Sequence, residues 1–277
     1  MTLSKSSDNL ALPRILCLHG GGVNAEIFRM QARCFISTLA PYFRLVFVDA
    51  PFECSPHYAI LEVYGEFGPF RRWMRWLPEH PELSATAASD AITHALTAGM
   101  TADPGTGPWV GVLGFSQGSK LASSLLFTQQ ALRETLGRDA SPWDFRFGVL
   151  MAGSAPPVVL DMRLQAPPGI DSPETLGFSF DAWPERPSAD EEERALQPSE
   201  HLIRTPTIHI HGTRDPGLAR HRQLLELYTE PGSAQLIEWD GDHRVPITKI
   251  EVEAMCNAIV ALAQKVGVLD KSRVSTL

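Results

Sequence analysis

One serine lies in a sequence context that could make its hydroxyl a nucleophile. Ser116 is the centre of Gly114-Phe115-Ser116-Gln117-Gly118, which fits the pattern G-x-S-x-G between a strand and a helix. Glycine at both flanks suits a sharp turn, because a Cβ there would collide with the neighbouring strand or helix turn. A serine hydroxyl is a weak nucleophile at neutral pH, so it needs a base and donors for a developing oxyanion. The motif therefore predicts acyl-transfer chemistry at Ser116.

The partners of such a serine are expected later in the chain, first an acid and then a histidine, each after a strand. Residues 206–212 alternate and are rich in β-branched residues, which predicts a strand, and Asp215 lies on the turn after it. Residues 234–239 predict the last strand, and His243 lies on the loop that follows. We expect His243 to be the base and Asp215 to orient it.

Non-catalytic interpretations of these residues remain open at this stage. Ser116 could simply cap the helix, and His243 could be a solvated loop histidine. Asp215 precedes a proline and could only begin a turn, which would leave Asp240 or Asp242 as the acid.

A second pair of histidines could suggest a metal site. His209 and His211 share one face of the strand at 206–212, but no third ligand lies at a useful spacing. We therefore expect the pair to be structural, and the sequence predicts neither a metal nor another cofactor.

A glycine-rich turn follows the first predicted strand, residues 14–18. Such a turn lets a backbone N–H face a reaction centre without an intervening side chain, so we expect the oxyanion donors to be the N–H groups of Gly21 and Gln117. Gly22 is a close competitor of Gly21. A phosphate-binding loop is the other interpretation, but the G-x-G-x-x-G spacing and a Lys-Ser/Thr pair are both missing.

The elements that must position these residues alternate between strands and helices from end to end. This pattern predicts an α/β protein with a mostly parallel sheet of about six strands and helices on both faces, an α/β-hydrolase, in one domain over 1–277. The predicted strands are 14–18, 44–49, 109–113, 145–151, 206–212 and 234–239. The predicted helices are 26–42, 84–100, the helix after Ser116 to about 136, and 249–266.

Two irregular segments leave the predicted sheet. Residues 52–83 are rich in aromatic residues, and we expect them to line the substrate mouth. Residues 156–201 hold eight of the 22 prolines and an acidic cluster, which suits a lid over the pocket. Leu176, Phe178, Phe180 and Trp183 would give this lid an apolar face that contacts substrate. The alternative is a surface loop whose aromatic residues only anchor it to the core.

Composition limits the partners. The net charge is −8 without a basic cluster, which argues against nucleic acid or an anionic membrane as partner. No stretch approaches the length of a membrane span, and no secretory leader is visible, so we expect a cytoplasmic protein. The four cysteines are separated and lie mostly in predicted strands and helices, which favours buried thiols over disulfides.

Five blocks resemble the fungal serine hydrolase family. They are Leu18-His19-Gly20, Phe47-Val48-Asp49-Ala50-Pro51, Gly114 to Gly118, Gly212 to Pro216, and Gly241-Asp242-His243-Arg244-Val245-Pro246. The segment Gly68-Pro69-Phe70-Arg71-Arg72-Trp73 is similar to a tryptophan-containing stretch of that family. The resemblance implies Ser116 as nucleophile, His243 as base and Asp215 as orienter. The triple glycine after His19 departs from many relatives, which carry bulkier residues there.

The resemblance also implies an activity. Members include stand-alone esterases and thioesterases that release finished polyketides from carrier proteins. We therefore expect hydrolysis of an acyl or polyketide thioester, with an acyl carrier protein as partner, in secondary metabolism. Open alternatives are a cyclase that forms a lactone from the same acyl-enzyme, a general carboxylesterase, and a receptor that keeps the triad only to anchor a ligand.

Overall fold

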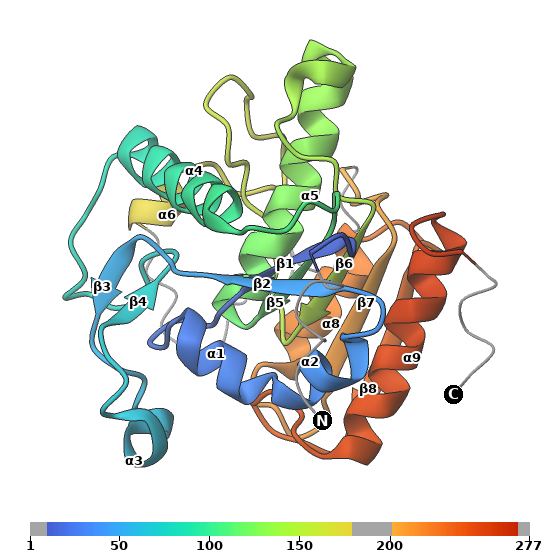
Figure 1. Ribbon diagram of the computed structural model, residues 1–277. Coiled ribbons are helices and arrows are strands. Elements are labelled where there is room, and N and C mark those ends of the chain that lie inside the picture. Colours follow the sequence, from blue (N-terminus) through green and yellow to red (C-terminus); the bar gives the residue numbers. More distant parts are fainter. Residues whose placement is uncertain (1–9, 179–200, 271–277) are drawn as a thin grey trace.

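The computed structural model of the protein describes residues 10–178 and 201–270. Its centre is a six-stranded sheet in which all neighbouring strands are parallel, in the order β2-β1-β5-β6-β7-β8 (Figure 1). The strands are β1 (Arg14–Leu18), β2 (Arg44–Val48), β5 (Trp109–Phe115), β6 (Phe147–Met151), β7 (Thr207–Gly212) and β8 (Ala234–Trp239). Strands β5, β6 and β7 are almost wholly buried, as expected of parallel strands covered on both faces.

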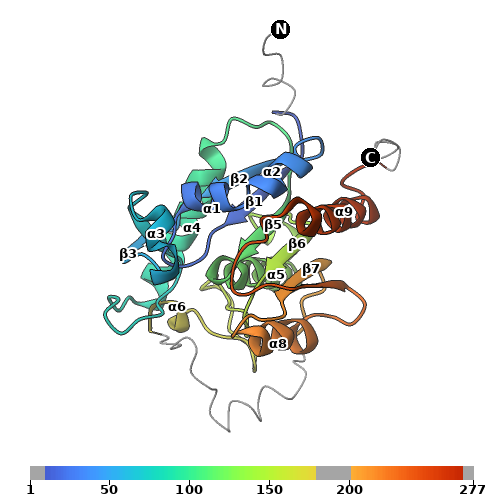
Figure 2. The ribbon, with the colours of Figure 1, turned by 90° about the horizontal axis from the view of Figure 1, so that it is seen from below.

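Helices cover both faces of this sheet (Figures 1 and 2). Side chains of α1 (Ala25–Gln31), α2 (Arg33–Leu39) and α9 (Lys249–Lys265) form one apolar core with the sheet. Side chains of α4 (Ala85–Ala102), α5 (Gln117–Leu136) and α8 (Leu218–Tyr228) form a second core on the opposite face. The predicted α/β-hydrolase architecture is therefore confirmed.

The parallel sheet brings distant parts of the sequence to one edge. Strands β5, β7 and β8 run in the same direction, so the loops at their carboxyl ends emerge together. Ser116 follows β5, Asp215 follows β7 and His243 follows β8. In open α/β sheets this edge is where ligands bind.

The helix predicted over 26–42 is in fact two helices. Ala32 separates α1 from α2 with φ −85° and ψ 13°, and its N–H donates to the carbonyls of Phe28 and Met30. No glycine or proline marks the break, so the apolar periodicity of the sequence could not reveal it.

The aromatic-rich segment 52–83 is more ordered than expected. It holds a short antiparallel pair, β3 (Phe52–Cys54) and β4 (Phe70–Arg72), with the one-turn helices η1 (Tyr58–Ile60) and α3 (Leu61–Tyr64) between them. Backbone hydrogen bonds join β4 to the glycine-rich turn, from the Gly22 N–H to the Arg71 carbonyl and from the Arg71 N–H to the Val23 carbonyl. These bonds place the segment beside the loop where an oxyanion donor is expected.

The described part of the proline-rich segment packs against the core. The N–H groups of Val158 and Leu160 donate to hydroxyls of α5, and Leu176 is buried. Two short helices complete the described elements, η2 (Arg138–Ala140) and α6 (Glu174–Phe178). Phe180, Trp183 and the side chain of Phe178 lie outside the described residues, so the lid and its substrate contacts stay predictions. Within the described ranges, none of the helices has the length and apolar character needed to cross a bilayer.

Candidate active site

The chain bends at Ser116 in a conformation that is unusual for a residue with a side chain. Ser116 has φ 54° and ψ −120°, between the end of β5 and the start of α5. This positive φ is a strained conformation for serine. The flanking glycines make the bend possible, because a Cβ on Gly118 would overlap the Leu18 carbonyl and one on Gly114 would overlap the backbone of Gly118.

The three residues that the sequence predicts as a triad lie in contact with one another. Nε2 of His243 lies 2.9 Å from Oγ of Ser116. Nδ1 of His243 lies 2.8 Å from Oδ2 of Asp215. With Nδ1 donating to the carboxylate, Nε2 carries the lone pair that can accept the serine proton.

The alternative acids are held elsewhere. Asp240 pairs with Arg214 at 2.5 Å, and Asp242 pairs with Arg244 at 2.8 Å. Asp215 is instead buried beside His243, so it is the carboxylate that the fold offers to the imidazole.

Asp215 is held ionised by its surroundings. Burial alone raises the pKa of the Asp215 carboxyl, but contacts from His221 and His243 outweigh burial and hold that pKa well below its usual range. Its Oδ1 accepts the N–H of Gly217 at 2.8 Å, while His221 Nε2 lies 3.1 Å from Oδ2. The carboxylate therefore meets two histidines and a backbone donor.

His221 is the residue of this site that the sequence did not predict. It lies on α8 and is fully buried, and its ring centroid is 6.2 Å from that of His243. Its Nδ1 lies 3.0 Å from the Gly153 carbonyl. In the sequence it stands between two arginines in an ordinary helix, so no motif signals its position.

Three side chains of this site lie close enough together to bind a metal ion, but their contacts with one another explain why they are close. Ligand atoms of Asp215, His221 and His243 lie within 4.8 Å of one another. The nitrogens of both histidines face the same carboxylate oxygen of Asp215, and the other nitrogen of His243 faces Ser116. These contacts occupy the atoms that a metal would need.

His209 and His211, which the sequence analysis expected to be structural, are both buried on β7. The two ring centroids are 5.9 Å apart, and Nε2 of His209 lies 3.2 Å from the Thr207 hydroxyl. Burial lowers the pKa of His209 to about 3 and that of His211 to about 4, with further lowering by the neighbouring histidines. Both rings are therefore neutral at pH 7.

The structure separates the two candidates for the first oxyanion donor. The Gly22 N–H donates to the Arg71 carbonyl at 3.0 Å, so it is committed to holding β4. Among the described residues, the N–H groups of Gly21 and Gln117 have no protein acceptor. Gly22 also has φ +75°, a left-handed conformation that favours glycine. The N–H groups of Gly21 and Gln117 thus remain available to a ligand.

Side chains below the turn hold this arrangement in place. The Gln117 side chain accepts the N–H of Trp73 at 2.6 Å and donates to the Met74 carbonyl at 2.9 Å. His19 bridges Gly20 and Ala50, donating from Nδ1 to the Gly20 carbonyl and accepting the Ala50 N–H at Nε2. Burial lowers the pKa of His19 to about 4, so the neutral ring that this pattern requires is the form present at pH 7.

An apolar surface adjoins the glycine-rich turn. The His57 N–H donates to the Gly22 carbonyl at 3.0 Å, which fixes the start of η1 beside the turn. Beyond it, large apolar side chains of the η1–α3 segment are exposed, namely Tyr58, Leu61, Val63 and Phe67. Burial and the nearby His243 lower the pKa of His57, in keeping with its place at the edge of the site.

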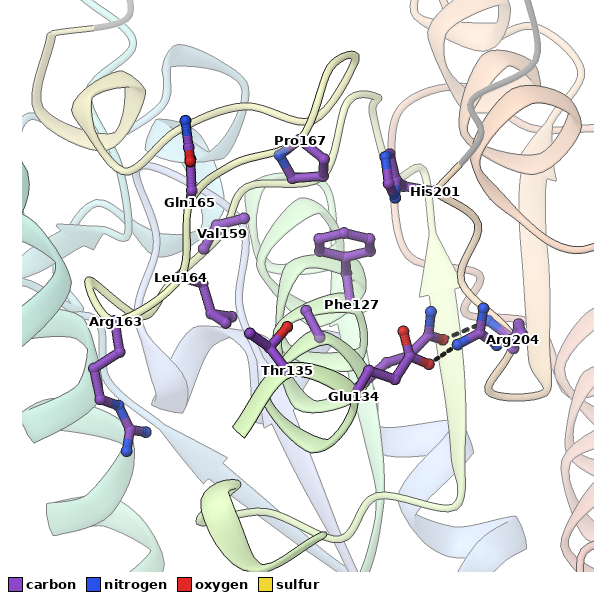
Figure 3. A pocket seen from close by; sticks show the side chains of 12 residues that line it. Phe127, Glu134, Thr135, Val159, Arg163, Leu164, Gln165, Pro167, His201 and Arg204 are labelled. Carbon is purple, nitrogen blue, oxygen red and sulfur yellow. Dashed lines mark hydrogen bonds and ion pairs between the residues drawn. The ribbon is translucent and has the colours of Figure 1, made fainter. Parts of the chain in front are cut away.

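A separate cavity lies away from this chemistry. It measures about 480 Å³ and is bounded by the C-terminal half of α5, residues 159–167 and residues 201–204 (Figure 3). Glu134 and Arg204 in its wall pair with each other, and Arg163 pairs with Asp161. No triad residue lines it. We therefore place the candidate active site at Ser116 and its side-chain contacts, and not at this cavity.

Comparison with known proteins agrees with this geometry. Residues 9–255 match the family model described as "Serine hydrolase (FSH1)". The chain belongs to this family. Family relatives include "Esterase claE" of Penicillium crustosum, 42% identical over 97% of this chain and 100% of that protein. "Esterase citA" of Monascus ruber is 45% identical over 94% of this chain and 95% of that protein. The protein is thus a member of the serine hydrolase family.

A solved structure supports the fold of this family member. Acyl-protein thioesterase 2 of Zea mays superposes with a TM-score of 0.50 at 18% identity, covering 91% of this chain and 94% of that one. At this identity the likeness establishes the α/β-hydrolase fold alone.

Proposed function

We propose that the protein is a thioesterase in which Ser116 attacks the carbonyl of an acyl or polyketide chain carried on an acyl carrier protein. The observation that carries the proposal is the contact between Ser116 Oγ and His243 Nε2, with Asp215 behind the imidazole. The family of esterases to which the chain belongs supports an acyl substrate.

The residues have distinct roles in the proposed reaction. His243 Nε2 takes the proton of Ser116 as Oγ bonds to the acyl carbon, and the carbonyl oxygen becomes an oxyanion facing the N–H groups of Gly21 and Gln117. Each such donor typically contributes about 3–4 kcal/mol to the transition state. The C–S bond then breaks, and the leaving sulfur takes the proton from His243.

Water completes the cycle. His243 accepts a proton from a water molecule as the water oxygen attacks the carbonyl carbon of the acyl-serine. The proton then returns from His243 to Oγ of Ser116 as the free acid leaves. Asp215 stays ionised throughout and stabilises the transient imidazolium. Side chains and backbone N–H groups of the chain supply every proton transfer and hydrogen bond in these steps.

The exposed apolar side chains beside the turn favour a chain-like acyl group. Tyr58 is 81% exposed and follows His57, whose N–H donates to the Gly22 carbonyl, and Val63 of the same segment is 67% exposed. Apolar side chains exposed together beside a reaction centre are typical of a site that receives an apolar ligand or partner.

The direct test compares the parent with Ser116→Ala on two substrates, a short p-nitrophenyl ester and an acyl thioester on a carrier protein. We expect both activities of the variant to fall by at least about a thousandfold. Activity within tenfold of the parent would show that Ser116 is not the nucleophile. Hydrolysis of the ester without any turnover of the thioester would leave a carboxylesterase in place of the proposed thioesterase.

Mass analysis of the released product separates hydrolysis from ring closure. The proposal expects the free acid, because water reaches the acyl-serine. A lactone as the main product would instead require the substrate's own hydroxyl to attack the same acyl-enzyme.

A further inference from the structure

Gln117 holds a second segment of the chain with its side chain, in addition to offering its N–H to an oxyanion. Its Oε1 accepts the N–H groups of Trp73 and Met74 at 2.6 and 3.2 Å, and its Nε2 donates to the Met74 carbonyl at 2.9 Å. Two donors facing the oxygen and one acceptor facing the nitrogen fix the orientation of the amide. The side chain therefore clamps the backbone that follows β4.

The clamped segment, residues 71–76, lies along the glycine-rich turn that follows β1. The indole Nε1 of Trp73 donates to the His19 carbonyl at 2.9 Å, where the turn begins. The Gly22 N–H donates to the Arg71 carbonyl at 3.0 Å, where the turn ends. The segment thus binds the turn on both sides of the expected oxyanion donor.

Trp76 lies against the residue whose N–H is that donor. A Cβ on Gly21 would come within 2.7 Å of the Trp76 ring, so the indole fills the space that a side chain would take. His80 holds the ring of Trp76: the two rings meet edge to face at 4.6 Å between centroids, and the Trp76 N–H donates to Nδ1 of His80 at 3.4 Å. The position of Gly21 is therefore tied to the same segment.

Direct packing between the nucleophile turn and the glycine-rich turn involves the first residues of the latter. A Cβ on Gly118 would overlap the His19 carbonyl. Gly21 comes two residues later, and the three atoms nearest to a Cβ there all belong to the ring of Trp76. The position of the first donor thus depends on the 71–76 segment as well as on the sheet.

We propose that Gln117, through its side chain, is a positioning residue for the oxyanion hole: by clamping the 71–76 segment, it sets the distance between the Gly21 N–H and its own N–H. Oxyanion donors act at about 2.7–3.1 Å from the developing charge. A displacement of about 1 Å at such a site costs on the order of a hundredfold in rate. The inference rests on the proposed acyl transfer at Ser116 and adds the side chain that keeps its two donors in place.

Gln117→Met tests the clamp, because methionine has a similar length and shape but forms none of the three hydrogen bonds, while the backbone N–H stays. We expect kcat on a p-nitrophenyl ester to fall about ten- to a hundredfold, with KM within about threefold of the parent. The oxyanion forms only in the transition states of acylation and deacylation, so misplaced donors leave substrate binding intact. A kcat within about twofold of the parent would overturn the proposal.

Inhibition by a trifluoromethyl ketone reports on the donors whatever fraction of the protein is active. Oγ of Ser116 bonds to the ketone carbon, its proton moves to His243, and the ketone oxygen becomes an oxyanion in the hole. We expect the inhibition constant of Gln117→Met to rise by about the factor by which kcat/KM falls. An unchanged inhibition constant beside a lower kcat would show that the clamp does not act on the donors.

Gln129→Met is the matched control. Gln129 lies on the same helix, is buried, and clamps another backbone: its Oε1 accepts the Phe145 N–H at 2.7 Å and its Nε2 donates to the Phe145 carbonyl at 3.0 Å. The control therefore loses an equivalent pair of hydrogen bonds away from the glycine-rich turn. We expect its kcat and inhibition constant to stay within about twofold of the parent. Equal losses in the two variants would reduce the role of Gln117 to general stability.

Trp73→Phe tests the same link from the glycine-rich turn, and it serves also if Gln117→Met does not fold. It removes the indole N–H that the His19 carbonyl accepts. We expect kcat to fall, and the double variant with Gln117→Met to lose less than the product of the two single losses, because both act through one segment. An unchanged kcat in Trp73→Phe, or single losses that multiply, would contradict that shared path.

Failure of this inference and failure of the proposed function give different results. An inactive Ser116→Ala beside a fully active Gln117→Met would remove the positioning role alone. Activity that survives in Ser116→Ala would remove the acyl transfer on which that role depends.

Discussion

At the scale of the residue, the site depends on one carboxylate placed correctly and one serine held in strain. Asp215 receives hydrogen bonds from the Gly217 N–H and from His243, which fixes the direction of the imidazole toward Ser116. Ser116 adopts a positive φ that serine rarely accepts, and this presents its hydroxyl to Nε2. The sequence predicted these three residues from motif and order, and their catalytic roles stay predictions until activity is measured.

Asp215→Asn tests the orienting carboxylate. The amide fits the same space, but it can present its NH₂ to Nδ1 and hold the wrong tautomer of His243. We expect kcat to fall by about ten-thousandfold, with little change in KM. Steady-state kinetics on a p-nitrophenyl ester measure both parameters, and a loss below tenfold would mean that Asp215 does not orient the base.

Treatment with a chelator tests whether the cluster of Asp215, His221 and His243 holds a metal. Their ligand atoms face one another and Ser116, so we expect esterase activity to be unchanged after dialysis against EDTA. Metal analysis of the dialysed protein is the control. Activity that is lost on dialysis and restored by zinc would contradict this account.

At the scale of the element, the turn at Ser116 between β5 and α5 requires two main-chain segments to approach more closely than any side chain allows. A Cβ on Gly118 would overlap the Leu18 carbonyl at the end of β1. The alternating and apolar patterns of the sequence predicted the six strands, because parallel strands buried on both faces are nearly continuous apolar runs. The same patterns missed the break at Ala32 and the β3–β4 pair, whose positions depend on tertiary hydrogen bonds such as that from Gly22 to Arg71.

Gly118→Ala tests this close approach. We expect a loss of about 3 kcal/mol in the free energy of unfolding, from overpacking, together with a large loss of activity as Ser116 shifts. Gly267→Ala is the control without a steric clash, because the space around its new Cβ is open and only the φ of +74° opposes a side chain. That control should cost about 1 kcal/mol and leave activity intact. Denaturant unfolding gives both values, and equal costs would refute the steric explanation.

At the scale of the whole molecule, the sheet joins residues that are 127 positions apart, since Ser116 and His243 meet only when β5 and β8 stand in one sheet. No local pattern encodes that distance. The motif predicted the order of nucleophile, acid and histidine along the chain. Their meeting in space follows from the order and register of the strands in the sheet, which the sequence analysis did not predict. The same burial that builds this core also encloses several histidines as neutral rings.

Stability should therefore depend on pH. His19, His209 and His211 have pKa values lowered to about 4, 3 and 4 in the folded protein, against about 6.5 when unfolded. Between pH 6.5 and pH 4 these histidines bind more protons in the unfolded chain than in the folded protein. Their contribution to the free energy of unfolding is therefore complete above pH 6.5 and is lost as the pH falls toward 4. We expect the free energy of unfolding to drop by about 1–2 kcal/mol per histidine between pH 7 and pH 5.

Denaturant unfolding at the two pH values measures this drop. His209→Gln should reduce the difference between pH 7 and pH 5, whereas His94→Gln, at an exposed position on α4, should leave it unchanged. A pH-independent free energy of unfolding in the parent protein would contradict the neutral, buried state of these rings.

The central claim is that Ser116 becomes covalently bonded to the acyl group, and active-site labelling tests it most directly. A fluorophosphonate probe, followed by digestion and mass mapping, should place the label on the peptide that contains Ser116. Labelling should be lost in Ser116→Ala and strongly slowed in His243→Ala, because the imidazole activates the hydroxyl. A label on any other residue, or an unlabelled Ser116 in folded protein, would contradict the acyl-serine mechanism.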